Sequence, residues 1–158
     1  MMRRVVILGR GGAGKSVLAR RLGELTALPV TELDRVFWSA DLQPTSRDAW
    51  EDVQRKLTMA EGWVLDGDLG PYDSLQPRLA AADTVVVLDF GLLRCAWRAL
   101  RRSPERADFW WWLLRWRGVY KRQLVAAVAR WAPGAQLHIL RTPRQAERFL
   151  AEAASESR

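Results

Sequence analysis

A glycine-rich run between two apolar segments constrains this chain more than any other feature. Residues 9–16 read GRGGAGKS, which fits the phosphate-binding pattern G-x-x-x-x-G-K-[ST]. A β-branched apolar run at 5–8 precedes it, and apolar residues at helical spacing follow it. A strand, a glycine loop and a helix in this order are the context that the pattern requires. The sequence therefore predicts an α/β fold with an anion site at the amino end of its first helix.

The residue types of this loop match the chemistry of a nucleotide tail. Glycines lack a Cβ atom, so the backbone can turn several N–H groups towards one anion. Lys15 is predicted to reach the outer phosphates as a point charge, and the Ser16 hydroxyl to serve Mg²⁺. The predicted nucleotide-binding residues of the loop are Gly9, Gly11, Gly12, Ala13, Gly14, Lys15, Ser16 and Val17.

Four further short apolar runs predict strands, and helical patterns separate them. The runs cover residues 29–33, 63–65, 84–88 and 136–140. Five such strands alternating with helices predict a parallel sheet covered on both faces, and 158 residues favour one domain.

Two helix starts are predicted from capping residues. Thr142 is the predicted N-cap of the last helix, with Pro143 at its first position and Gln145 reaching back. Thr45 with Asp48 predicts a second capping box, before a helix through Trp50.

Several carboxylates follow predicted strands, where open α/β sheets bind ligands. A phosphate loop usually works with an acid near Mg²⁺ at the end of a neighbouring strand. Asp66 and Asp89 both fit this description, and the pattern alone does not separate them. Asp34 is a third strand-end acid, which either accepts a hydrogen bond from a phosphate acceptor or caps a turn.

The net charge of +7 suits anionic ligands, whether nucleotides, nucleic acid or a membrane surface. Arg94, Arg98 and Arg102 are four residues apart on one predicted helix face, so they form either a clamp on a transferring phosphoryl group or a solvated basic face. The aromatic stretch at 109–122 is interpreted as core plus lid, with a nucleic-acid stacking surface and a membrane-surface helix as alternatives.

Cysteine content and the amino terminus bear on location. Cys95 is the single cysteine, so no internal disulfide is expected, and packing explains it better than nucleophilic chemistry. The amino terminus offers too short an apolar run for a signal peptide, and no run is long enough to span a membrane. These features predict a soluble cytoplasmic protein. His138 lies in a predicted strand without a partner motif and is interpreted as structural.

Several stretches of the chain together resemble a known family. They are GRGGAGKS, ELDRVFW, WVLDGDLG, RLAAADTVVVLDF, the arginine helix, LLRWRGVYKR and HILRTPRQAERFL. With them the chain resembles the adenylate-kinase-like group of P-loop proteins. It is most similar to the small bacterial group called DNA topology modulation proteins. The resemblance extends over nearly the whole chain.

The resemblance implies a three-layer α/β/α P-loop fold, with strand order 2-3-1-4-5 and a helical lid at about 101–122. It favours Asp66 over Asp89 as the acid beside a metal-bound water. It also implies a set of further site residues, with acceptor contacts from Asp34, Asp68 and Arg78, phosphate contacts from Arg98 and Arg102, and adenine contacts from Thr142 and Pro143. The lid lacks the cysteine cluster of zinc-bearing relatives, so no zinc is expected.

The function expected from these features is transfer of the γ-phosphate of ATP, with Mg²⁺, to a small molecule of the nucleoside or nucleotide type. The catalytic residues would be Lys15, Asp66, Arg98 and Arg102, with Ser16 and Asp66 on the metal. The alternatives are a nucleotide-dependent regulator associated with nucleic acid and, less favoured, a protein that binds membranes or partners through the tryptophan-rich helix.

Overall fold

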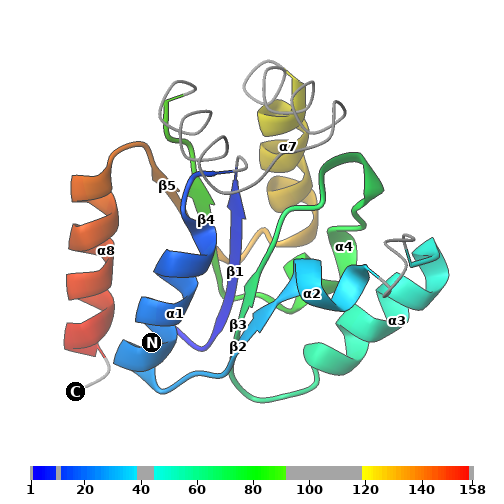
Figure 1. The fold of residues 1–158 in the computed structure, drawn as a ribbon, viewed down its shortest axis with the longest axis horizontal. Helices are drawn as coiled ribbons and strands as arrows, with labels where there is room; N and C mark the ends of the chain where they lie inside the picture. The colour runs from blue at the N-terminus through cyan, green and yellow to red at the C-terminus, as the bar shows by residue number, and fades with distance from the viewer. Residues whose placement is uncertain (1, 10–11, 39–44, 92–118, 157–158) are drawn as a thin grey trace.

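The computed structural model describes residues 2–9, 12–38, 45–91 and 119–156. Its centre is an all-parallel five-stranded sheet in the order β2-β3-β1-β4-β5 (Figure 1). The strands are β1 Arg4–Gly9, β2 Val30–Glu32, β3 Trp63–Asp66, β4 Thr84–Leu88 and β5 Gln136–Leu140. The predicted strand count and strand order are therefore confirmed, and β4 and β5 have the predicted bounds.

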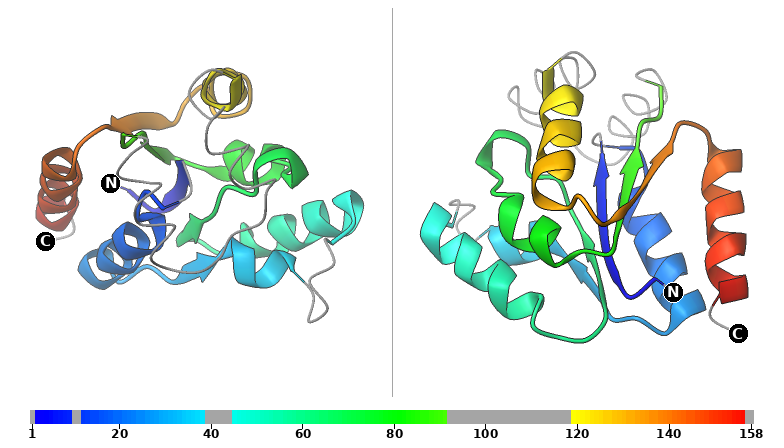
Figure 2. Two further views of the ribbon diagram at one scale, coloured as in Figure 1. Left: turned by 45° about the horizontal axis from the view of Figure 1, so that its top comes forward. Right: turned by 180° about the vertical axis from the view of Figure 1, so that it is seen from behind.

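Helices cover both faces of the sheet, as the views of Figure 2 show. The helices are α1 Lys15–Thr26, α2 Leu33–Phe37, α3 Arg47–Leu57, the 3₁₀ helix η1 Gly70–Tyr72, α4 Gln76–Ala81, α7 Lys121–Trp131 and α8 Pro143–Glu156. One apolar core joins the sheet to α1 and α8, and the other joins it to α2, α3, α4 and α7. This is the predicted three-layer α/β/α architecture.

The period of two along β1 explains how one strand serves both cores. Val5 and Ile7 point into the core under α1 and α8, whereas Val6 and Leu8 point into the opposite core. All four side chains are fully buried. A continuous apolar run is the pattern of a central parallel strand covered on both sides.

The two predicted helix caps have opposite outcomes. At α8 the Gln145 N–H donates to the Thr142 hydroxyl at 3.3 Å, and the Gln145 side chain accepts from the Arg141 N–H at 2.6 Å, which confirms the predicted cap. The cap at Thr45 is wrong, because α3 begins after Ser46 and the Thr45 hydroxyl donates instead to the Phe37 carbonyl.

The strand register brings the expected functional segments to one edge of the sheet. Ile7 of β1 is paired with Asp66, and Gly9 with Leu88, so the phosphate loop begins beside Asp66 and Asp89. This is the carboxyl edge of the strands, where open α/β sheets bind ligands. Among the helices of the described ranges, none has the length and apolar character needed to cross a membrane.

Candidate functional site

The loop between β1 and α1 has the backbone of an anion site. Gly14 precedes α1 in the left-handed conformation, with φ of 94°, which glycine adopts without steric cost. No side chain caps this end of α1, so its first N–H groups are left for water or an anion. Gly12 and the buried Ala13 lie in the turn before it. Gly11, although predicted here, lies outside the described residues.

Gly9 is required by close packing at the start of the loop. A Cβ atom at Gly9 would lie 2.5 Å from the carbonyl oxygen of Leu88, and φ is 141°. Any larger residue would therefore push β1 away from β4 at the edge where the loop begins. The glycine at the first position of the motif thus allows the start of the loop to pack directly on β4.

Asp66 lies beside the loop with one of its two carboxylate oxygens unused. Its side chain is 3% exposed, it forms a hydrogen bond with Ser16, and its Oδ1 atom has no partner among the described residues. Burial raises the pKa of Asp66, while the nearby Lys15 charge and the Ser16 hydrogen bond act in the opposite direction. A buried oxygen without a partner is costly unless a cation or donor binds there.

These residues fit Mg²⁺ held jointly by the protein and a phosphate chain. Mg²⁺ keeps several waters and takes one or two protein oxygens together with substrate phosphates. Ser16 and Asp66 supply such oxygens next to the phosphate loop. The described residues contain no group of three or more His, Cys, Asp or Glu side chains that would enclose a metal ion without a substrate.

The buried Asp66 carboxyl predicts a pH dependence of stability for the protein without nucleotide and metal. Because burial raises its folded pKa above the ordinary 3.8, the folded state keeps this proton to higher pH than the unfolded state. The free energy of unfolding therefore loses this contribution as the pH rises through that window. We expect Asp66→Asn to be more stable than the wild type at pH 7, with a smaller difference at pH 4, in urea unfolding.

A matched control for this prediction is Asp52→Asn, which changes an exposed acid on α3. It should shift stability little at either pH. A lower stability of Asp66→Asn at pH 7 would mean that the contacts to Lys15 and Ser16 outweigh the burial of the charge.

Asp89 has partners of a different kind. It is 3% exposed, and its Oδ2 atom accepts from the Lys121 ammonium at 2.6 Å, with Arg141 4.0 Å away. Lys121 is the first residue of α7, so this pair joins the end of β4 to a helix 32 residues further along the chain. The two acids that the sequence pattern left open therefore have different surroundings: Asp66 lies next to Lys15 and Ser16 of the loop, and Asp89 pairs with Lys121.

Asp34 and Asp68 lie on the side of Asp66 away from β4. Asp34 is exposed in α2, directly after β2, and close enough to raise the pKa of Asp66 further. Asp68 is half-buried in the loop after β3, and its Oδ1 atom accepts from the Gly70 N–H at 3.1 Å. Burial and the proximity of Asp73 raise the pKa of Asp68, while Lys15 acts in the opposite direction. Both acids thus lie near the phosphate loop at the carboxyl edge of the sheet.

Arg78 has a role other than the expected one. Its side chain is fully buried, and its guanidinium donates to both oxygens of Asp73, at 2.9 and 2.5 Å, and to Gln54 Oε1 at 2.7 Å. A further bond at 3.3 Å reaches the Gly67 carbonyl in the loop after β3. A guanidinium committed in this way does not reach an acceptor phosphate, and its contacts assign it to holding the loop that carries Asp68.

A cavity of about 160 Å³ lies between the phosphate loop and the last helix. Its walls come from α1, the end of β4 and the start of α8, and include Val17, Phe90, Pro143, Ala146 and Leu150. The volume is below the roughly 300 Å³ of a pocket for a whole drug-sized ligand, so the cavity has room for only part of a nucleotide. Thr142 lies next to it as the N-cap of α8.

Some of the predicted site residues lie outside the described residues, and two contacts in the site were not predicted from the sequence. Arg98, Arg102 and most of the predicted lid at 101–122 lie in the part of the chain that the structure does not describe. Sequence reasoning missed Phe90, which lines the cavity, and Lys121, which pairs with Asp89. Phe90 had a signal, because it follows Asp89 at the end of the most apolar strand. Lys121 had none, because its partner is distant in sequence.

Comparisons with known proteins show the fold. No family model matches the sequence, and neither does any curated protein. Among solved structures, a sugar kinase from a Janibacter species is 17% identical with a TM-score of 0.62, over 99% of this chain and 98% of that one. A shikimate kinase from Acinetobacter baumannii, in complex with shikimate, is 17% identical with a TM-score of 0.63, over 96% and 90%.

A third similar structure is a gluconokinase from Sinorhizobium meliloti, which is 20% identical with a TM-score of 0.57, over 98% and 94% of the two chains. The three structures share the architecture of this chain along nearly its full length, as the P-loop kinase-like resemblance predicted. None of the three is described as associated with DNA, so the finer resemblance to DNA topology modulation proteins stays a prediction.

Proposed function

We propose that this protein is a kinase that transfers the γ-phosphate of ATP to a hydroxyl group of a small molecule. One observation carries the proposal. The amino end of α1, which has no side-chain cap, carries Lys15 and lies beside Asp66, a buried acid next to Ser16 whose Oδ1 atom has no partner among the described residues. That combination supplies backbone donors, a lysine cation and a metal-side acid at the carboxyl edge of one sheet.

The described residues divide the work of binding ATP. The loop amides and Lys15 bind the phosphate chain, while Ser16 and Asp66, the latter through water, hold Mg²⁺. Mg²⁺, when bound, neutralises charge on the phosphates. Fold similarity to kinases adds to the proposal by analogy only.

The reaction is an in-line displacement. The acceptor oxygen forms a bond to the γ-phosphorus while the bond from that phosphorus to the bridging oxygen breaks, and ADP leaves. We assign the proton released by the acceptor hydroxyl to the Asp34 carboxylate, and from there to water. Arg98 and Arg102 are proposed to contact the transferring phosphoryl group. Residues at about 101–122 are proposed to form a lid over it. The chain is proposed to form a single domain and to work in the cytoplasm.

The cavity beside α8 is proposed to take the adenine ring. Pro143 lines it, Thr142 precedes Pro143 as the N-cap of α8, and Ala13 and Gly14 of the phosphate loop contribute to its other wall. We expect Ala146→Leu to weaken binding of ATP with Mg²⁺ roughly tenfold, because the larger side chain fills a space of this size. Titration calorimetry of the wild type and the variant measures the effect.

The same helix offers a control for this titration. Ala151→Leu makes the identical change at an exposed position of α8 and should leave the affinity unchanged. If the two variants bind ATP with equal affinity, the adenine ring does not occupy this cavity. A wild type without affinity for ATP and Mg²⁺ would contradict the proposed function itself.

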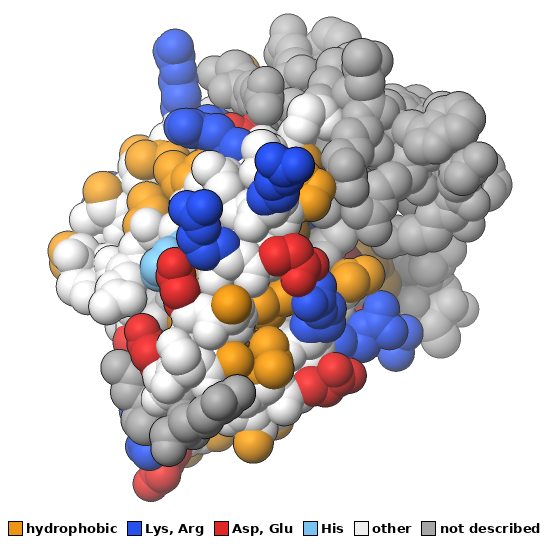
Figure 3. All heavy atoms as spheres, turned by 90° about the vertical axis from the view of Figure 1, so that its left-hand side faces the viewer, with side chains coloured by type: hydrophobic (Ala, Val, Ile, Leu, Met, Phe, Trp, Pro, Cys, Tyr) orange, Lys and Arg blue, Asp and Glu red, His pale blue; other side chains and the backbone are white. Residues whose placement is uncertain are grey.

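No observation favours the nucleic-acid alternative. Binding to a nucleic-acid backbone needs a continuous basic surface. On the face of α1 and α8, positive and negative side chains are interspersed (Figure 3), and Arg21 there pairs with Glu147.

A further inference from the structure

Two short elements follow the strands β2 and β3 next to Asp66, where the acceptor is expected. They are α2, which follows β2, and the loop from β3 to α4, which contains η1. Glu32 of β2 is paired with Asp66 of β3, so both elements leave the sheet at its carboxyl edge side by side. The chemistry of these two elements decides which acceptors fit, and this inference rests on the proposed function.

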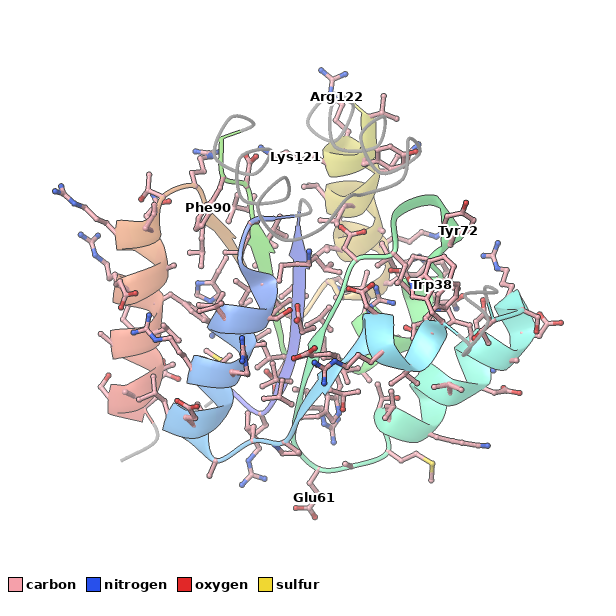
Figure 4. The ribbon with its side chains drawn as sticks, viewed as in Figure 1. Trp38, Glu61, Tyr72, Phe90, Lys121 and Arg122 are labelled. Carbon is pink, nitrogen blue, oxygen red and sulfur yellow. The ribbon has the colours of Figure 1, made fainter. Side chains whose placement is uncertain are left out.

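Two aromatic rings come together where these elements meet. Trp38, at the end of α2, and Tyr72, in η1, have ring centroids 5.9 Å apart with a 72° angle between the planes. Figure 4 shows the two side chains next to each other. Tyr72 is 49% exposed, and Trp38 rests on the buried Phe37 ring at 4.9 Å. A supported, partly exposed pair of rings offers an apolar face for a ligand.

The cations of these elements are already committed. In the described part of α2, the β3–α4 loop and α4, the basic residues are Arg35 and Arg78. Arg78 is buried against Asp73. Arg35 pairs with Glu32 at 2.9 Å, and its side chain is 81% exposed. Burial thus keeps Arg78 from an anionic acceptor, and Glu32 partly neutralises the charge of Arg35.

The acids of the same region are numerous. Glu32 and Asp34 are close enough to raise the pKa of Asp66, and Asp73 does the same for Asp68. Like charges brought together at a binding site cost several kcal/mol, whereas hydroxyl and amine donors satisfy carboxylates.

We propose that the acceptor is a ring-bearing hydroxyl compound without negative charge. Its ring lies against Trp38 and Tyr72, and its hydroxyl or amine groups donate to Asp34 and Asp68. This excludes nucleoside monophosphates and sugar acids as the preferred acceptors and favours nucleosides, neutral sugars and amino sugars.

Matched acceptor pairs test the proposal in the full chain with ATP and Mg²⁺. The pairs are cytidine and its 3′-monophosphate, adenosine and its 3′-monophosphate, and glucose or glucosamine and glucuronate, so that each pair keeps its ring and its primary hydroxyl or ring form while the charge changes. We expect transfer to uncharged or cationic members, with kcat/KM roughly hundredfold above that of the anionic partner. Preference for the anionic member, or transfer to none of the uncharged and cationic members, overturns the proposal.

Variants locate the selectivity. Trp38→Ala and Tyr72→Ala should each raise KM for the reactive acceptor roughly tenfold and leave KM for ATP unchanged. Met59→Ala, at a side chain 82% exposed beyond the end of α3, should change neither. Asp68→Asn should reduce the ratio of kcat/KM for the uncharged or cationic acceptor to kcat/KM for its anionic partner. Unchanged acceptor KM in both aromatic variants overturns the ring contact, whereas absent binding of ATP in the wild type contradicts the proposed function instead.

Discussion

Replacing Lys15 by alanine is expected to lower the rate of phosphate transfer roughly 10²- to 10³-fold, the loss typical of removing one group that stabilises transition-state charge. Lys15 is the first residue of α1, and its charge acts to lower the pKa of both Asp66 and Asp68. Negative charge develops on the oxygen that bridges the β- and γ-phosphorus atoms as its bond to the γ-phosphorus breaks. Removing the lysine should therefore slow the chemical step as well as weaken ATP binding. Release of labelled phosphate product under saturating ATP measures it.

The control for Lys15→Ala is Lys56→Ala, which removes an exposed lysine near the end of α3. This control should retain full transfer. Urea unfolding should give similar stability for both variants and the wild type, so that a lost rate is not a lost fold. A Lys15→Ala protein that transfers phosphate at the wild-type rate would contradict the proposed function.

Local signals in the sequence were sufficient for the sheet and the phosphate loop. The run at 84–88 has three consecutive valines between Thr84 and Leu88, and β4 has those bounds. Thr142, Pro143 and Gln145 are close together in sequence, so their cap is determined by neighbours and was predicted correctly. Thr45 failed because its hydroxyl bonds to Phe37, a contact that depends on how α2 and α3 are placed.

The choice between the two strand-end acids needed information that a local pattern does not contain. Asp66 and Asp89 both follow apolar strands, and β3 and β4 both flank β1. What separates them is the partner each acid has in space, which is Ser16 for Asp66 and Lys121 for Asp89. The family resemblance favoured Asp66 as the metal-side acid, and that assignment stays a prediction.

The position of Arg78 also depends on contacts that a local sequence pattern does not contain. A lone arginine before an apolar strand is most often exposed, and the resemblance placed it at the acceptor. Its burial depends on Asp73, five residues earlier, and on Gln54 in α3. Asp73 in turn accepts from the Leu69 N–H at 3.1 Å and from the Trp50 indole at 3.2 Å. Burial alone would raise the pKa of Asp73, but the Arg78 charge and these hydrogen bonds outweigh it and lower the pKa.

Arg78→Met is expected to cost about 3–5 kcal/mol of unfolding free energy, because it leaves the Asp73 carboxylate buried without its counter-charge. Adding Asp73→Asn should recover most of this loss, since the amide still accepts from Leu69 and no buried charge is left unpaired. Arg55→Met is the matched control. Arg55 pairs with Glu51 and Asp52 on the exposed side of α3 and should cost less than about 1 kcal/mol.

Urea unfolding of Arg78→Met, the double variant and Arg55→Met, each against the wild type, measures these losses of stability. It distinguishes the effect of breaking a buried ion pair from the effect of removing any arginine. If Arg78→Met is too unstable to purify, the double variant with Asp73→Asn still decides the question, because it should fold. Equal costs for Arg78→Met and Arg55→Met would show that the Asp73 pair contributes no more than a surface contact. The loop that carries Asp68 and Tyr72 would then need another support, because Arg78 bonds both Asp73 and the Gly67 carbonyl within it.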